Sequence, residues 1–247
     1  MIVDAHAHLG FDEVFDEDFT EDILLASQEQ NRIDVTLVQP ATVHDLIGAQ
    51  RQHDAIAALV ARYPTRFRGI ANPNPHLPEQ EYTQEMLRCV EQLGFIGIKI
   101  HPFAHAVHPL GRHGRRAFQL ANDLRLPAIV HTGAGIPWAA PSLLEPIAEQ
   151  FPGLQLVVAH AGGMMLAGEA ALLATQHENV YLEPSWVGGY IVRRWVRELG
   201  AHRILFGSDH ADNAATELTK FRSAGLTEED LSWVLGRSAA AVFNLKE

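Results

Sequence analysis

Two histidines stand close together near the start of the chain, in the run Asp4-Ala-His-Ala-His8. Side chains alternate between the two faces of a β-strand, so a His-x-His pair in a strand places both imidazoles on one face. Two imidazoles on one face are half of a metal site. An isolated pair is equally compatible with an ordinary strand, so its meaning depends on where the other polar residues fall.

The elements that would position these residues follow a regular order. Eight short runs rich in apolar and β-branched residues begin at intervals of roughly 25 to 30 residues, which is about one βαβ period. Segments with helical spacing of apolar residues lie between them. We therefore predict a single-domain, distorted (β/α)8 TIM barrel over residues 1–247. The predicted strands are 2–8, 35–39, 67–72, 95–101, 127–131, 154–160, 180–185 and 204–209.

Two more helices are expected after the eighth strand. The first covers residues 214–222. Thr227 and the three acidic residues after it are typical of a helix start, because the threonine side chain caps the first turn and the acids favour its positive end. The last helix, predicted over 231–245, has an apolar stripe that would close the barrel wall.

Every predicted strand ends in a polar residue. In a TIM barrel the carboxyl ends of the strands meet at one face and carry the active site. A catalytic zinc ion is held by imidazole and carboxylate ligands at about 2.0 to 2.2 Å, with one position open to water. His6 and His8, His131 and Asp209 would supply such a set. The strand-end residues are His6, His8, Gln39, Asn72, Lys99, His101, His131, His160, Glu183, Ser185 and Asp209.

Five ordered motifs at these strand ends are Asp4-Ala-His-Ala-His8, Gly97-Ile-Lys-Ile-His-Pro102, Val130-His-Thr-Gly133, Val158-Ala-His-Ala-Gly-Gly163 and Phe206-Gly-Ser-Asp209. Together they resemble the amidohydrolase superfamily, in its compact metal-dependent branch with a TIM-barrel fold. The resemblance implies that His6, His8 and His131 bind the metal, with Asp209 as ligand and general acid/base. It also implies that His160 is a second-metal ligand or a polarising acid/base group.

Lys99 leaves the number of metal ions open. It is similar to the lysine that dihydroorotase-like relatives carbamylate to bridge two ions, whereas in one-metal members it would serve the substrate or an inner ion pair. We favour one divalent ion, with zinc as the first choice. His101 shares a strand face with Lys99, and we assign His101 and Glu183 to substrate binding. Glu183 could equally tie the barrel mouth together.

The resemblance implies a metal-dependent hydrolase in which a metal-bound water cleaves an amide, cyclic amide, ester or lactone bond in a small molecule. Asp209 would move the proton, His160 would polarise the substrate, and Lys99 would assist. The alternative is a metal-dependent decarboxylase of an aromatic or muconate-like carboxylic acid. A TatD-type phosphoesterase is disfavoured because the fourth strand offers lysine and histidine where that class has a metal-binding glutamate. A non-catalytic barrel would require a broken ligand set.

Composition excludes two kinds of partner. The net charge of −11 would repel the phosphate backbone of nucleic acids, and no apolar run approaches the about 18 residues that span a membrane. The single cysteine, Cys89, fits a reducing compartment, and no secretory signal is recognised. We expect a cytoplasmic protein with a small-molecule substrate, and a homo-oligomer is compatible with this. Trp138 and Trp186 are candidates for the wall of an apolar pocket.

Overall fold

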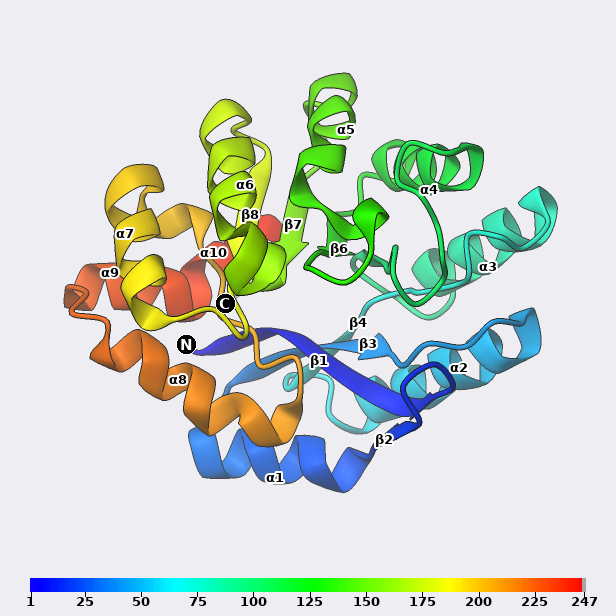
Figure 1. Ribbon diagram of the computed structural model, residues 1–247. Coiled ribbons are helices and arrows are strands. Elements are labelled where there is room, and N and C mark those ends of the chain that lie inside the picture. Colours follow the sequence, from blue (N-terminus) through cyan, green and yellow to red (C-terminus); the bar gives the residue numbers. More distant parts are fainter. Residues whose placement is uncertain (246–247) are drawn as a thin grey trace.

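The computed structural model describes residues 1–245 and places short strands inside a ring of helices (Figure 1). Residues 246 and 247 of the predicted domain lie outside the described part. Two sheets contain the strands, in the orders β2-β1-β3-β4 and β5-β6-β7-β8. The strands are β1 (Val3–Asp12), β2 (Glu17–Phe19), β3 (Val35–Pro40), β4 (Phe67–Gly69), β5 (Ile98–Ile100), β6 (Ala128–His131), β7 (Leu156–Ala159) and β8 (Val180–Glu183).

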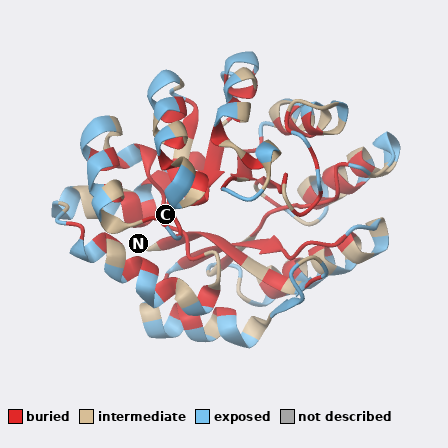
Figure 2. Cartoon of the chain, in the orientation of Figure 1, coloured by how far each residue is buried: buried red, intermediate tan, exposed pale blue. Residues whose placement is uncertain are grey.

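The helices follow the strands in alternation and cover the outside of the sheets. They are α1 (Glu21–Asn31), α2 (Leu46–Arg62), α3 (Glu79–Glu91), α4 (Arg112–Asp123), α5 (Glu145–Gln150), α6 (Gly163–Gln176), α7 (Gly189–Leu199), α8 (Ala214–Ser223), α9 (Glu228–Ser232) and α10 (Ser238–Val242). Figure 2 shows that buried residues occupy the strands and the helix faces turned toward them. Among residues 1–245, no helix is both long enough and apolar enough to cross a lipid bilayer.

The two sheets join into a ring through short bridges. One bridge connects the segment after β4 to β5, and residues 204–209 run between β8 and β1. The bridges are Ala71 with Ile98, Leu182 with Ile204, and Ala7 with Asp209, all parallel. The predicted TIM-barrel fold is therefore confirmed. The predicted eighth strand differs in that it makes isolated bridges, because Asp209 leaves the extended region with a φ of 62°.

A bulge in β1 turns the two N-terminal histidines toward the barrel axis. Val3 and Ala5 belong to an inner apolar cluster, whereas Ala7 packs in the larger outer cluster between strands and helices. The register with β3 slips between Asp4 and Ala7. One extra residue in a strand shifts the alternation of faces beyond it. His6 and His8 consequently lie on the inner side, above the apolar interior.

Two elements differ from the prediction. β2 pairs antiparallel with β1 in a short hairpin that the sequence patterns did not indicate. The predicted last helix is divided, because a π-helical turn at Trp233–Arg237 lies between α9 and α10. In that turn Gly236 lies against the backbone carbonyl of Met1, where a Cβ atom has no room. The Thr227 cap is confirmed, since it forms a reciprocal capping box with Asp230.

Candidate active site

The strand-end residues gather at the carboxyl end of the barrel, around one cavity. β1 supplies His6 and His8, β6 ends in His131, His160 follows β7, and Asp209 ends the closing segment. The cavity has a volume of about 190 Å³. Its wall consists of His8, Asp12, Phe15, Glu17, Phe19, His101, His131, His160, Asp209 and His210.

The donor atoms of three predicted metal ligands lie as close to one another as the ligand atoms around a bound metal ion. His6 Nε2 lies 3.2 Å from His8 Nε2 and 3.2 Å from Asp209 Oδ1, and His8 Nε2 lies 3.6 Å from the same Oδ1. Ligand atoms on a tetrahedral ion with bonds of about 2.0 to 2.1 Å stand about 3.3 to 3.4 Å apart. The spacing of the three atoms therefore fits one divalent cation.

The tautomers of the two histidines support the same conclusion. His6 Nδ1 is 2.7 Å from Glu183 Oε2, and His8 Nδ1 is 3.2 Å from Pro40 O. A carboxylate and a carbonyl only accept hydrogen bonds, so each Nδ1 carries the proton and each Nε2 is proton-free. Two imidazole lone pairs and the Asp209 carboxylate thus face one another, and this arrangement of buried acceptors favours a cation between them.

Burial sets the charge of the site. It lowers the pKa of His6 and of His131 well below 6.5, so both rings are neutral near pH 7 and their lone pairs are free to bind a metal. It lowers the pKa of His160 to about 4. For Asp209 burial acts in the opposite direction, but the neighbouring His160 and His6 outweigh it and hold its pKa well below the ordinary value.

Lys99 lies directly beside the three converging atoms. Its Nζ is 2.8 Å from His6 Nε2, and the side chain is 1% exposed. Burial lowers the pKa of Lys99 to about 8, against the opposing attraction of Asp209 and Glu183. The amine is therefore the positive group next to the acceptor set, and it lies below the cavity wall.

The other predicted site residues surround these three ligand atoms. His131 lines the same cavity, with its ring stacked on His101 at 4.0 Å between centroids and edge-on to His160 at 4.7 Å. His101 is 6% exposed, and its Nδ1 accepts a hydrogen bond from Ala104 N at 3.1 Å. Glu183 is completely buried beneath the cavity and bonds to His6 and Ser185. It does not form part of the cavity wall.

A family model for amidohydrolases matches residues 3–245. The chain belongs to the amidohydrolase family. It is 23% identical over 259 residues to the gamma-resorcylate decarboxylase of Rhodococcus jostii (strain RHA1), with 80% of this chain and 76% of that protein covered. It is 30% identical over 139 residues to the 2-keto-4-carboxy-3-hexenedioate hydratase of Sphingobium sp. (strain NBRC 103272 / SYK-6), covering 47% of this chain and 40% of that protein.

A solved structure supports the fold of this amidohydrolase. It is a dihydroxybenzoic acid decarboxylase from Polaromonas sp. JS666, with bound manganese and the inhibitor 2-nitroresorcinol. The two chains have a TM-score of 0.78 and 18% identity, with 100% of this chain and 97% of the other covered. Among the curated relatives that the chain matches, the share of their own length that it spans ranges from 17% to 76%.

Several residues in the cavity wall of this amidohydrolase belong to no motif that predicts a site. The β1-β2 hairpin brings Phe15, Glu17 and Phe19 into the cavity wall, and His210 joins them. Their only sequence signal is an aromatic residue at every fourth position in the acidic segment from Phe11 to Phe19. A hairpin too short for a hydrophobic pattern gave no reason to place this segment over the barrel.

The two candidate tryptophans take different roles. Trp186 Nε1 donates a hydrogen bond to Asp209 Oδ2 at 2.8 Å, which leaves Oδ1 to face the histidines. Trp138 Nε1 donates to Pro102 O at 2.9 Å and so ties two loops together. Only Trp186 therefore contacts the ligand set.

Four of the nine described non-glycine residues with a positive φ lie at the site, namely His160, Ala161, Trp186 and Asp209. The segment from His160 to Gly163 has four successive positive φ angles of 60°, 43°, 78° and 59°, and Asp209 and Trp186 are also left-handed. Such conformations persist only where the surroundings hold them. The Thr132 hydroxyl does so after β7, since it accepts from Gly162 N and donates to Ala159 O, both at 2.8 Å.

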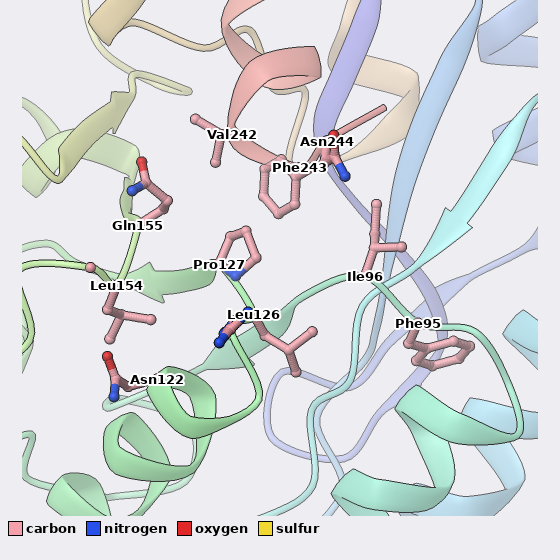
Figure 3. Close-up of a pocket in the computed structure, with 12 residues that line it drawn as sticks. Phe95, Ile96, Asn122, Leu126, Pro127, Leu154, Gln155, Val242, Phe243 and Asn244 are labelled. Carbon is pink, nitrogen blue, oxygen red and sulfur yellow. The ribbon is translucent and has the colours of Figure 1, made fainter. Parts of the chain in front are cut away.

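A larger cavity of about 690 Å³ lies at the opposite end of the barrel (Figure 3). Its lining includes Pro127 and Gln155, which directly precede β6 and β7, and Ile96, which lies two residues before β5. Among the described residues, its wall has no histidine, cysteine or acid. Active sites of TIM barrels lie at the carboxyl ends of the strands, so this cavity is not the candidate active site.

Proposed function

We propose that this amidohydrolase is a metal-dependent decarboxylase of a small aromatic acid with one carboxylate. Two of the three relatives named above are decarboxylases and the third is a hydratase. They favour decarboxylation, which the family resemblance implied as the alternative to hydrolysis. The shape and charge of the cavity support it independently.

One observation carries the proposal: the cation-binding atoms and an aromatic wall share one small cavity. Phe15 and Phe19 line it beside the histidines, with the Phe19 ring 5.3 Å from that of His8, and Phe15 stacks on Phe103 at 5.7 Å between centroids. A dry cavity of about 150 Å³ holds a benzene molecule. The cavity of about 190 Å³ therefore has room for one substituted six-membered ring beside the ligand set.

The charge of the wall favours a substrate with a single carboxylate. Asp12, Glu17 and Asp209 line the cavity, and an adjoining one of about 250 Å³ adds Asp18 and Asp212. Within residues 1–245, no lysine or arginine lines either cavity. One carboxylate can be neutralised by the cation, but a second would meet the acidic residues of the wall with no lysine or arginine beside it in the described lining. This argues against di- and tricarboxylic substrates.

His6, His8 and Asp209 would hold the ion, with His131 as the next candidate. Imidazole and carboxylate donors suit both zinc and manganese. When bound, the ion would supply Lewis-acid polarisation of a substrate oxygen.

The residues of the chain would handle the proton. Loss of carbon dioxide leaves an electron pair on a ring carbon, and that carbon must take up one proton. We assign its delivery to Asp209, which His160 would reload with a proton taken up from solvent in each turnover; Asp209 Oδ1 lies 3.9 Å from His160 Nε2. The Phe15 and Phe19 rings would exclude water from this transfer, and Lys99 would balance the buried negative charge.

The test is release of carbon dioxide by zinc- or manganese-loaded protein from 2-hydroxybenzoate and 2,6-dihydroxybenzoate. An amide, a lactone and a benzene dicarboxylate serve as comparison substrates. Asp209→Asn should lower turnover by about 10²- to 10⁴-fold, the usual value of a general acid/base. The exposed His202→Gln should have no effect. Hydrolysis of the amide or lactone, with no carbon dioxide from any aromatic acid, would refute the proposal.

A further inference from the structure

Below the cavity, one buried carboxylate contacts both of the histidines that flank Asp209. Glu183 and Ser185 are each 0% exposed. Glu183 Oε2 lies 2.7 Å from His6 Nδ1 and 3.0 Å from Ser185 Oγ, and Ser185 Oγ lies 2.7 Å from His160 Nδ1. The carboxylate thus reaches His6 directly and His160 through one hydroxyl.

The direction of these hydrogen bonds follows from the groups around Glu183. The backbone N–H groups of Ser185 and His160 point at its oxygens, at 2.6 and 3.4 Å, and N–H groups can only donate. Glu183 is therefore the acceptor of this network. A hydroxyl has a single proton. If Ser185 donated this proton to His160, Ser185 Oγ and Glu183 Oε2 would face each other at 3.0 Å without a proton between them. Ser185 therefore donates to Glu183, and its Oγ accepts a hydrogen bond from His160 Nδ1–H.

We propose that Glu183 and Ser185 are positioning residues that set the tautomers of His6 and His160. Both rings then carry their proton on Nδ1 and leave Nε2 proton-free. His160 Nε2 faces the cavity, whereas His6 Nε2 faces His8 Nε2, Asp209 Oδ1 and the Lys99 ammonium. His6 Nε2 serves the cation, and His160 Nε2 accepts a hydrogen bond or proton from the substrate side. The tautomers stand on the geometry alone, whereas their use by His160 in turnover rests on the proposed function.

The surroundings give this network its space and its rigidity. A Cβ atom on Gly207 would lie 2.8 Å from the Glu183 carboxyl carbon and 2.8 Å from His6 Cβ. Only glycine lets the two side chains meet here. His160 itself has a φ of 60°, and its backbone N–H is held by Glu183 at 3.4 Å. The same carboxylate thus orients the ring and supports the strained backbone that carries it.

The direct test is nitrogen NMR of ¹⁵N-histidine-labelled, metal-free protein, with His160 assigned from the His160→Gln spectrum. We expect the Nδ1–H form for both His6 and His160. Ser185→Ala should turn His160 into a mixture of tautomers and leave His6 unchanged, and Ser185→Thr should restore it. Glu183→Gln should change the nitrogen signals of both the His6 and the His160 ring. Ser223→Ala, an exposed serine on α8, is the matched control and should change neither.

Metal affinity provides a second readout. Removing an outer partner of a metal-binding histidine typically costs 10- to 100-fold in affinity. We therefore expect Glu183→Gln to weaken zinc binding by about 10- to 100-fold in a chelator competition. Ser185→Ala should change it by less than about threefold, because His160 is not one of the three converging ligands.

Two results would overturn the inference: an Nε2–H form of His160 in the unmodified protein, or an unchanged His160 signal in Ser185→Ala. Failure of the proposed function has a different signature. A protein with the expected tautomers that releases no carbon dioxide from aromatic acids would contradict the decarboxylase and leave the positioning role intact.

Discussion

Asp209 has two oxygens with separate partners, and this separation organises the candidate metal centre. Oδ1 faces His6 and His8, while Oδ2 accepts the indole N–H of Trp186 at 2.8 Å. Without that hydrogen bond the carboxylate could rotate and present either oxygen, or both, to the histidines. Outer partners of this kind orient metal ligands and are worth about 10- to 100-fold in affinity.

Trp186→Phe tests this role. The change keeps an aromatic ring and removes only the N–H donor, so we expect zinc affinity to fall by about 10-fold while the free energy of unfolding of the metal-free protein changes by less than about 1 kcal/mol. Trp233→Phe is the matched control, because its indole N–H also binds a carboxylate, that of Glu229, on the exposed face of α9. Equal zinc affinity in all three proteins would contradict the role.

The sequence indicated which residues gather at the site, but it did not indicate which partners they contact there. Histidines and acids at strand ends are visible as a pattern, because strands end where the chain must turn and the turns share one face. The contacts of Trp186 and Ser185 depend on left-handed backbone at loop positions, such as the φ of 65° at Trp186. No apolar period encodes such angles, so these partners could not be predicted.

At the scale of elements, the segment 204–209 combines two tasks. Its first half carries Leu205 in the inner core, and its second half bends so that Asp209 meets β1. The sequence predicted a strand there because the apolar run is typical of one. Gly207 and the left-handed Asp209 end the ladder early, and this departure from strand geometry is what aims the carboxylate at the histidines.

Gly207→Ala should damage the site from within the barrel wall. The new Cβ would lie 2.8 Å from both Glu183 and His6. Overpacking of this kind costs about 1 to 3 kcal/mol, and we expect a matching loss in the free energy of unfolding together with weaker zinc binding. Thermal unfolding and zinc titration measure the two effects.

Gly168→Ala is the control for that change. Gly168 lies within α6, and a Cβ there would meet nothing within 4 Å. An alanine in place of a helical glycine should stabilise the protein by about 0.5 to 1 kcal/mol. If Gly207→Ala behaved like Gly168→Ala, the close packing around Glu183 and His6 would be refuted.

The fold was predictable where periodicity is long and strong. The strand and helix order, the TIM barrel and the Thr227 cap all follow from local patterns. The strand β2 was not predictable. Its three residues, Glu17–Phe19, are held by pairing with β1 and have no apolar alternation of their own. The π turn in the last helix depends on packing of Gly236 against Met1, a contact between the two ends of the chain that no local pattern encodes.

At the scale of the molecule, a buried pair between α2 and α3 should contribute to acid stability. His53 Nδ1 lies 2.6 Å from Glu85 Oε1, and both residues are buried. Burial would raise the pKa of Glu85, but hydrogen bonds from His53 and Arg88 outweigh it and lower the pKa to about 2. Burial lowers the pKa of His53, so the ring is neutral in the folded protein.

The sign of the pH dependence follows from both shifts. A depressed carboxyl pKa stabilises the fold above about pH 4.5, and this contribution is lost as the pH falls toward 2. Neutral His53 likewise loses its contribution as the pH falls below about 6.5. We expect Glu85→Gln to lower the free energy of unfolding by about 2 kcal/mol at pH 7 and by progressively less below pH 4.5.

Urea unfolding at several pH values measures this difference. Glu91→Gln, an exposed position on the same helix, is the control and should follow the unmodified protein at every pH. A difference between Glu85→Gln and the unmodified protein that stayed constant down to pH 3 would contradict the assigned pKa of Glu85.

The isolated bridges that close the barrel have a consequence for how the molecule opens. His6 and His8 belong to one sheet, His131 belongs to the other and His160 directly follows its strand β7, and Asp209 belongs to the segment between the sheets. In the described part of the chain the two sheets meet here through isolated bridges and not through a continuous ladder, so local opening should begin at this seam. An ion held across it would act as a cross-link and stabilise the closed ring by about 2.7 kcal/mol at a hundredfold excess over its Kd. Occupancy of the site and integrity of the ring are thus one linked equilibrium.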